Sequence, residues 1–386
     1  MRASMVSAAL VAALVGYGST IALLLAAAAA VGATPAQTAS WILAICLAKA
    51  IGSAFLSWQS RVPVVLAWST PGAALVAATE GIGMAEAVGA FLLAGGLIAL
   101  TGAVKPLGRL VALIPDGIAA AMLAGVLLPF CLRLPGAAEA LPALLLPVIA
   151  VFALVRLWNP AMAVLAALAT GGLLAFAGGA SLPPLALGLP SLTLIEPEFR
   201  VSVLLGLGVP LYLVTMASQN LPGFAVLRAA GYVPPVRPAL TVTGGLSALS
   251  ALFGAHTISM AAITAAICLG DEVHPDRAQR WKVGLIYAAV WLALGAFGPV
   301  ILAVIGALPA ALITGIVGLA LLSPLMGAAS GAFAVPEQRF AAVVTLTVTA
   351  SGVAVFGIGA AFWGLAAGLL VFALEAVAAR RRLRRA

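Results

Sequence analysis

The chain has 386 residues, of which 64% are hydrophobic and 8% are charged, and its formal net charge is +8. Soluble domains carry about 25% charged residues, so this composition excludes a protein that covers its core with polar side chains in water. The cysteines, Cys46, Cys131 and Cys268, are scattered, which indicates neither a disulfide framework nor a metal site. We therefore expect an all-α polytopic membrane protein without a cofactor.

Apolar runs long enough to cross a membrane follow one another along the chain. A spanning helix needs about 20 apolar residues, and on this criterion we predict about fourteen transmembrane segments, with boundaries accurate to several residues. The first lacks a short apolar region followed by a cleavage site, so we interpret it as a retained span. The ninth and tenth run together without a polar break. The segments are 5–32, 36–58, 62–80, 84–104, 110–130, 139–156, 160–177, 201–221, 237–250, 250–269, 282–304, 306–326, 340–358 and 360–379.

Basic residues give an independent test of these segments, because cytoplasmic loops are enriched in Lys and Arg. An even number of crossings puts both termini on one side, and the tail "RRRLRR" predicts that this side is the cytoplasm. Arg133 and Arg200 then lie outside, Lys49 lies within the second segment, and all other basic residues, Arg109 among them, are cytoplasmic. Glu196 is expected outside. The positive charge therefore reflects topology and contact with anionic lipid, not nucleic-acid binding.

The two halves of the chain share a pattern that is typical of inverted repeats in transporters. Gly32 and Gly231 each end a long apolar run, and Pro35 and Pro234 follow at the same distance. In each half the third run is interrupted, first at "STPG" (69–72) and then at "GAHT" (254–257). We predict two inverted seven-segment repeats, in which segments 3 and 10 are half extended and half helical.

The two interruptions have a physical interpretation. The run "VPVVLAW" (62–68) is rich in β-branched residues and contains a proline, so it favours an extended chain. Thr70 is expected to cap a following helix that ends near Glu80, and Thr257 a second helix that ends near Gly270. Both helices would begin at the membrane midplane. Their free N–H groups suit an anionic group of a substrate.

Two stretches carry a resemblance to a known family. "TMASQNLPGFAVLRAAGYVPP" (215–235) and "FGAHTISMAAITAAICLGDEVHPDRAQRW" (253–281) resemble hallmark segments of the benzoate/proton symporter (BenE-type) family. The resemblance extends over the whole chain. It implies an importer of benzoate in the bacterial inner membrane, driven by protons, with the seven-plus-seven inverted-repeat fold of nucleobase/ascorbate and sulfate-type anion transporters.

The resemblance also implies a division of the chain. Segments 1–4 and 8–11 form a core domain, about 1–105 and 201–304, and the others a gate domain, about 106–200 and 305–379, followed by the basic tail 380–386. Nucleobase carriers have a glutamate in segment eight, where this chain has "MASQN". The missing acid suits a carboxylate substrate.

Polar residues inside apolar segments are candidates for substrate binding. His256 is ionisable within the membrane, where such a residue marks a functional site by default, and it could carry the coupled proton. The alternative is a neutral histidine bonded to a backbone carbonyl. The polar runs of segments eight and one could bind a carboxylate and a ring, or hold helices together. The candidates are Tyr17, Ser19, Thr20, Ser69, Thr70, Ser218, Gln219, Asn220, His256 and Thr257.

Lys49 has two interpretations that the sequence leaves open. It lies in the middle of the second segment without an evident acidic partner in the membrane. Its charge could hold positive potential for an anion, or its long stem could reach an interface. His274 lies in the loop "GDEVHPDRAQRW" (270–281) and is expected to be solvated.

We predict a secondary transporter of benzoate or a related aromatic acid, coupled to protons. The partners would be benzoate, protons and membrane lipid, and a homodimer stays open. The alternative is another anion carrier or a nucleobase carrier of the same fold. A membrane enzyme is disfavoured, because no paired carboxylates, Ser-His-Asp order or metal cluster falls within a segment, and no phosphate-binding loop indicates a primary pump.

Overall fold

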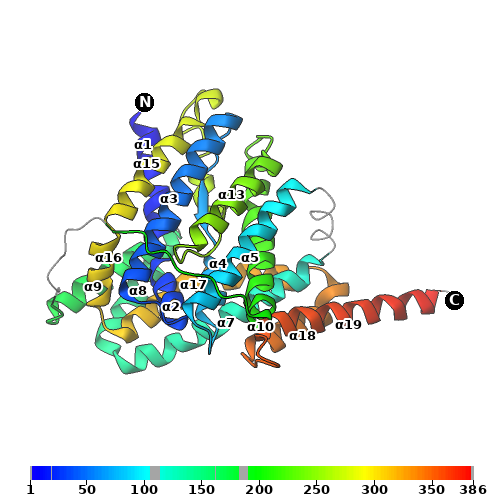
Figure 1. Ribbon diagram of the computed structural model, residues 1–386. Helices are drawn as coiled ribbons and strands as arrows, with labels where there is room; N and C mark the ends of the chain where they lie inside the picture. The colour runs from blue at the N-terminus through cyan, green and yellow to red at the C-terminus, as the bar shows by residue number, and fades with distance from the viewer. Residues whose placement is uncertain (1, 19, 105–113, 161, 182–189, 384–386) are drawn as a thin grey trace.

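The computed structural model describes residues 2–18, 20–104, 114–160, 162–181 and 190–383, and most of this part of the chain is helical (Figure 1). The helices of the first part are α1 (Ala3–Gly18), α2 (Ile21–Ala30), α3 (Pro35–Ser60), α4 (Thr70–Ala77), α5 (Met84–Ala103), α7 (Asp116–Ala140), α8 (Pro142–Trp158) and α9 (Ala163–Ala177). Short strands at β1 (Leu66–Trp68) and β2 (Ile258–Met260) lie at the centre.

The second part begins with a long helix that contains two π-helical turns. Its pieces are α10 (Val201–Val203), η1 (Leu204–Gly208), α11 (Val209–Thr215), η2 (Met216–Asn220) and α12 (Leu221–Ala229). The later helices are α13 (Val236–Ala251), α14 (Ile263–Ile267), η3 (Arg277–Gln279), α15 (Lys282–Ala296), α16 (Gly298–Gly306), α17 (Ala310–Ala332), η4 (Pro336–Gln338), α18 (Arg339–Ala350) and α19 (Ala360–Leu383).

The chain is a multi-pass helical membrane protein, as predicted. Within the described residues, seven helices are long and apolar enough to cross a membrane, or eight if α15 and α16, bent by 56°, form one span. Other predicted segments correspond to shorter pieces, such as α8, α9 and the strand–helix pairs. The predicted number of crossings therefore stays a prediction, and so does the inverted repeat.

The two strands pair with each other in the middle of the molecule. They are antiparallel, with Trp68 opposite Ile258 and Leu66 opposite Met260. Side chains satisfy backbone groups at the outer edges: Ser53 Oγ accepts from the Leu66 N–H at 3.0 Å, and Ser247 Oγ accepts from the Ile258 N–H at 2.9 Å. This matters because extended backbone inside a membrane must be hydrogen-bonded by the protein itself.

The predicted form of segment 3 is confirmed, with one correction. The chain is extended at β1 and helical from Thr70, and the helix α4 ends at Ala77. The cap is Ser69, whose Oγ accepts from the Gly72 N–H at 3.1 Å, so the prediction that Thr70 caps the helix is wrong. Pro71 then lies one position later than predicted, where the missing N–H still costs nothing.

Segment 10 also combines extended and helical chain, but its helix begins later than predicted. Gly254, with φ of +92°, turns the chain after α13, and residues 255–260 are extended. Helix α14 begins only at Ile263, so Thr257 does not cap a helix. The reason is pairing with β1: the Ser69 N–H donates to the Thr257 carbonyl at 2.9 Å, which continues the ladder and keeps residue 257 extended.

Segment 13 is shorter than predicted. Helix α18 ends at Ala350, whereas the prediction extended it to 358. Gly352, Phe356 and Gly357 have φ of +67°, +54° and +72°, and such left-handed residues cannot continue a right-handed helix. The chain re-enters helix at Ala360 as α19.

Helices α5 and α13 approach most closely at glycines. A Cβ at Gly244 would overlap the backbone of Ala99, and a Cβ at Gly95 would lie 2.6 Å from the Ala248 nitrogen. Small residues at these positions permit the direct backbone contact that is typical of membrane helices. The two helices lie side by side in Figure 1.

A Gly244→Ala variant should be less stable than the parent by about 1–3 kcal/mol, because the added methyl forces α5 and α13 apart. Gly245→Ala is the matched control, since no atom lies within 4 Å of its Cβ position. Thermal unfolding of both variants in detergent measures the difference. Equal melting temperatures would contradict the close contact.

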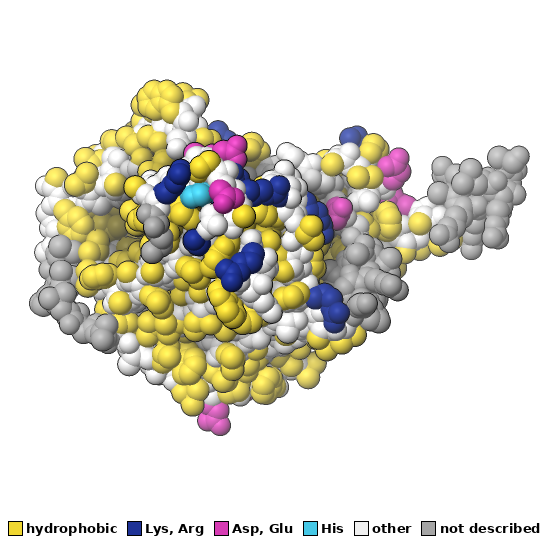
Figure 2. All heavy atoms as spheres, turned by 90° about the horizontal axis from the view of Figure 1, so that it is seen from above, with side chains coloured by type: hydrophobic (Ala, Val, Ile, Leu, Met, Phe, Trp, Pro, Cys, Tyr) yellow, Lys and Arg dark blue, Asp and Glu magenta, His cyan; other side chains and the backbone are white. Residues whose placement is uncertain are grey.

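Basic side chains gather at one end of the molecule (Figure 2). Contacts bring several segments together there: the Arg61 guanidinium lies 4.2 Å from the Trp281 ring centroid, and that of Arg277 lies 4.2 Å from the Tyr232 ring centroid. Arg237 Nη2 donates to the Ala103 carbonyl at 3.1 Å, where α5 ends. At the start of α5, Arg200 instead pairs with Glu86 at 3.0 Å. The two ends of α5 therefore lie on opposite faces of the molecule.

Candidate functional site

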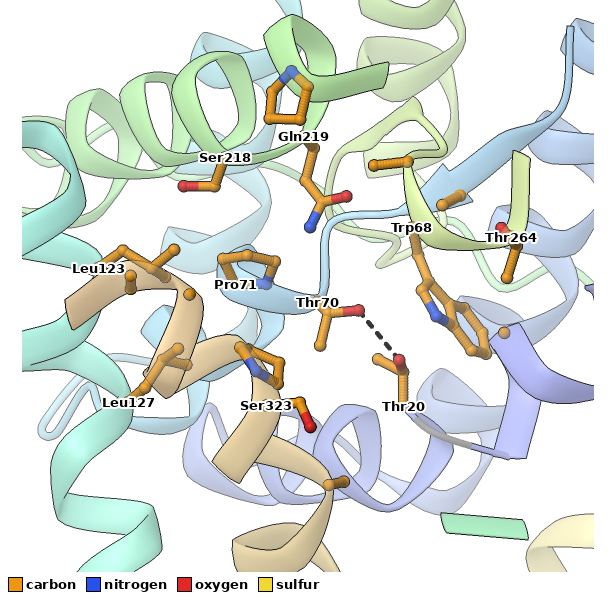
Figure 3. A pocket seen from close by; sticks show the side chains of 18 of the residues that line it. Thr20, Trp68, Thr70, Pro71, Leu123, Leu127, Ser218, Gln219, Thr264 and Ser323 are labelled. Carbon is orange, nitrogen blue, oxygen red and sulfur yellow. Dashed lines mark hydrogen bonds between the residues drawn. The ribbon is translucent and has the colours of Figure 1, made fainter. Parts of the chain in front are cut away.

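A cavity of about 560 Å³ lies beside the strand–helix junctions (Figure 3). One wall comes from the central strands and helices and carries most of the polar side chains. The other comes from α7, α8, α9 and α17 and is mainly apolar. The polar wall contains Thr20, Lys49, Thr70, Ser218, Gln219, Thr264 and Tyr287, and the apolar wall includes Leu123, Leu127, Phe152, Val164 and Pro324.

The π-helical turn η2 supplies two of the predicted residues. It comprises the sequence "MASQN", in which Ser218 and Gln219 are half-buried and line the cavity. A π turn accommodates an additional residue in one turn of the helix, and such turns are frequent at functional sites. In Figure 3 Gln219 extends from this turn toward Thr70. The turn thus gives the cavity an amide and a hydroxyl group.

Two other predicted residues that line the cavity are in contact with each other. The Thr20 and Thr70 Oγ1 atoms are 2.9 Å apart and share a hydrogen bond (Figure 3). Thr20 lies between α1 and α2, and Thr70 is the first residue of α4. The bond therefore ties the break in the first segment to the helix start in the third, and both residues line the cavity.

A buried chain of hydroxyl groups supports the start of α4 from behind. Thr215 Oγ1 donates to Ser69 Oγ at 3.0 Å, and it lies 2.8 Å from Thr257 Oγ1. Since Thr215 has one proton to give, Thr257 is the donor in the second bond. Neither Ser69 nor Thr257 lines the cavity. In this structure they hold the strand pair, α4 and α11 together.

His256 also lies behind the cavity wall, where both ring nitrogens are hydrogen-bonded. The side chain is 0% exposed. The Trp41 indole N–H donates to Nδ1 at 3.0 Å, and Nε2 lies 3.2 Å from the Ser69 carbonyl. An indole nitrogen can only donate, so Nδ1 is the acceptor and Nε2 carries the proton. The ring is neutral in this arrangement, which matches the alternative interpretation considered from the sequence.

Asn220 and Tyr17 are likewise buried away from the cavity. Asn220 Oδ1 accepts from the Met260 N–H at 2.9 Å and so completes the outer edge of β2. Tyr17 packs against Trp68, with ring centroids 5.5 Å apart, and its hydroxyl has no hydrogen-bond partner among the described residues. Ser19 lies outside the described residues. Substrate-binding roles for these residues stay predictions.

The cavity contains functional candidates that the sequence did not single out. Trp68 belongs to the extended run, and Thr264 and Tyr287 lie in long apolar stretches, so only the packing of distant segments shows that they meet. Asp116 lines the cavity from the exposed first turn of α7 and is its acidic residue among those described. In the sequence, Asp116 was recognisable only as an acidic residue near the end of a predicted segment. That position does not indicate a cavity.

The chain matches one family along nearly its whole length. The model of the family described as "BenE: Benzoate membrane transport protein" matches residues 1–374. The inner membrane protein YdcO of Escherichia coli (strain K12) is 41% identical over 372 residues, which cover 96% of this chain and 95% of that protein. The benzoate membrane transport protein of Acinetobacter baylyi is 33% identical over 361 residues, or 93% and 92% of the two chains.

A solved structure with a similar fold is that of a transport protein. The transmembrane domain of a cyanobacterium bicarbonate transporter, BicA, superposes with a TM-score of 0.60 at 16% identity, over 96% of this chain and 98% of that chain. At this identity the likeness concerns the fold alone. The resemblance found in the sequence is confirmed, and the family and the Acinetobacter baylyi relative are membrane transport proteins, not enzymes.

Proposed function

Because this chain belongs to the BenE family of benzoate membrane transport proteins, we propose that it imports benzoate or a related aromatic carboxylate together with protons. The cavity between a polar and an apolar wall is the observation that carries the substrate class. A benzoate ion has a charged end and an apolar ring, so each wall matches one part of it. Sites of this kind commonly combine apolar linings with a few polar groups.

The start of α4 is the place where we expect the carboxylate to bind. Pro71 has no N–H, and the Gly72 and Ala73 N–H groups donate to Ser69, so the start of α4 contributes mainly its partial positive charge. Thr70, Ser218 and Gln219 supply hydrogen bonds on the same wall. Helix α14 has only five residues, so α4 is the helix whose start faces the expected carboxylate, and two opposed helix ends are not required.

Alternating access is the mechanism that we propose for this cavity. It requires the predicted inverted repeats, with the core and gate domains moving against each other. The cavity lies between helices of those two groups, which supports this division. The hydroxyl chain of Ser69, Thr215 and Thr257 would keep the substrate wall rigid while the apolar wall of α7 and α17 moves.

Both termini and the basic face should be cytoplasmic, with the protein in the bacterial inner membrane. In a variant without native cysteines, a cysteine at Arg277 should react with an impermeant reagent only from the cytoplasm. A cysteine at Glu196 should react only from outside, since that exposed residue lies in the segment bonded to the start of α5. The opposite pattern would overturn the orientation. The predicted position Arg109 lies outside the described residues.

Uptake of labelled benzoate into proteoliposomes tests the proposed function. Accumulation should follow an imposed pH gradient, acidic outside, and should exceed that of protein-free liposomes, which take up some benzoic acid by diffusion. Substituted benzoates should compete, whereas uracil should not. Competition by uracil without uptake of benzoate would favour the alternative, a nucleobase carrier of the same fold.

A further inference from the structure

Lys49 is a buried lysine at the edge of the cavity. It lies in the middle of α3, its side chain is 1% exposed, and it lines the cavity. The ammonium nitrogen lies 2.9 Å from the ring centroid of Trp291 and 4.4 Å from that of Trp68. Trp68 comes from β1 and Trp291 from α15. The lysine therefore does not extend to a membrane interface.

The surrounding rings hold the ammonium from one side. Trp68 and Trp291 pack edge to face with centroids 5.3 Å apart, and Tyr287 packs against Trp291 at 5.9 Å. The negative face of an aromatic ring attracts a cation, most strongly where water is excluded. This contact fixes the position of the charge but adds no opposite charge.

No carboxylate of the described residues neutralises Lys49. The ion pairs in this part of the chain are Arg200–Glu86 and Arg280–Asp271, both near loops. A charged group inside a membrane is costly unless it is paired, and such a group characteristically faces a cavity or a transport path. Lys49 lines the cavity, and an anionic ligand bound there would supply the missing charge.

We infer that Lys49 is the residue that pairs with the carboxylate of the transported anion, with Trp68 beside the ring of the ligand. This inference rests on the proposed function, that the cavity takes an aromatic carboxylate. It makes Lys49 the determinant of charge selectivity: the cavity should prefer a carboxylate to a neutral group of the same shape. The polar side chains of η2 and α4 then orient a ligand whose charge Lys49 recognises.

Binding of benzoate and benzamide to the purified protein in detergent tests this role. Benzamide has nearly the same shape but no charge. We expect the parent to prefer benzoate, and Lys49→Met to weaken benzoate binding about 10- to 100-fold while benzamide binding changes less than about threefold. Methionine keeps an unbranched stem, and removing an unpaired buried charge should not lower the melting temperature.

Arg61→Met is the matched control, because it removes a cation that faces a tryptophan ring outside the cavity. It should leave both affinities unchanged. Equal loss of both ligands in Lys49→Met, or no loss of benzoate, would overturn the inference. If that variant does not fold, the parent decides: equal affinities for benzoate and benzamide would overturn it as well. A parent that binds neither ligand refutes the proposed function instead.

Discussion

A Gln219→Glu variant is expected to lose measurable benzoate binding and benzoate uptake. Glutamate has nearly the shape of glutamine, so the change adds a negative charge and little else. Gln219 lines the cavity from η2 and extends toward Thr70, where the carboxylate is proposed to bind. Two like charges in such a site cost several kcal/mol, which corresponds to a loss of about 100-fold or more in affinity.

Pairing of the new carboxylate with Lys49 would have the same result, because it would neutralise the cation that the ligand needs. Gln219→Met, which is neutral, is the control and should reduce benzoate affinity only about tenfold, the effect of one lost hydrogen bond. Equilibrium binding of labelled benzoate to both variants gives the comparison. Unchanged affinity in Gln219→Glu would place the carboxylate outside this part of the cavity.

The first strand–helix junction could be predicted because its signals are local. The β-branched run and the proline of 62–68, followed by "STPG", favour extended chain and then a helix start, and the structure has both. The second junction could not be predicted in the same way. Residues 258–260 become a strand because they pair with β1, far away in the sequence, and no local preference of "ISM" requires this.

The candidate site shows the same division. Polar residues in apolar runs indicated Thr20, Thr70, Ser218 and Gln219, which line the cavity, and their role in substrate binding stays a prediction. The same signal indicated Asn220 and His256, which instead complete hydrogen bonds behind its wall. The sequence indicates that a polar group is buried, but only the fold determines whether this group faces a ligand or a backbone group. The surroundings of Lys49 could not be predicted either, since its aromatic neighbours come from two distant segments.

The proton coupling predicted for His256 has a structural requirement. Trp41 donates to Nδ1, so a second proton can bind there only if that hydrogen bond breaks, because both nitrogens would then be donors. Trp41 belongs to α3, the helix that also carries Lys49. Protonation of His256 would therefore release a contact between α3 and the chain that leads to β2. That movement is a means by which a proton could change the substrate wall.

A His256→Gln variant should abolish proton-driven accumulation of benzoate and keep downhill exchange. Glutamine can accept from Trp41 and donate to the Ser69 carbonyl, but it does not titrate near neutral pH. A gradient of about one pH unit supports about tenfold accumulation per proton, and we expect no accumulation in the variant.

His274→Gln is the control, because it changes the other histidine of the chain, in the loop 270–281. The measurement is labelled benzoate in proteoliposomes, corrected for protein-free liposomes, with exchange against unlabelled benzoate as the test of folding. If the His256→Gln protein still concentrates benzoate like the parent, the proton moves by another route and His256 serves only to join α3 to the start of α4.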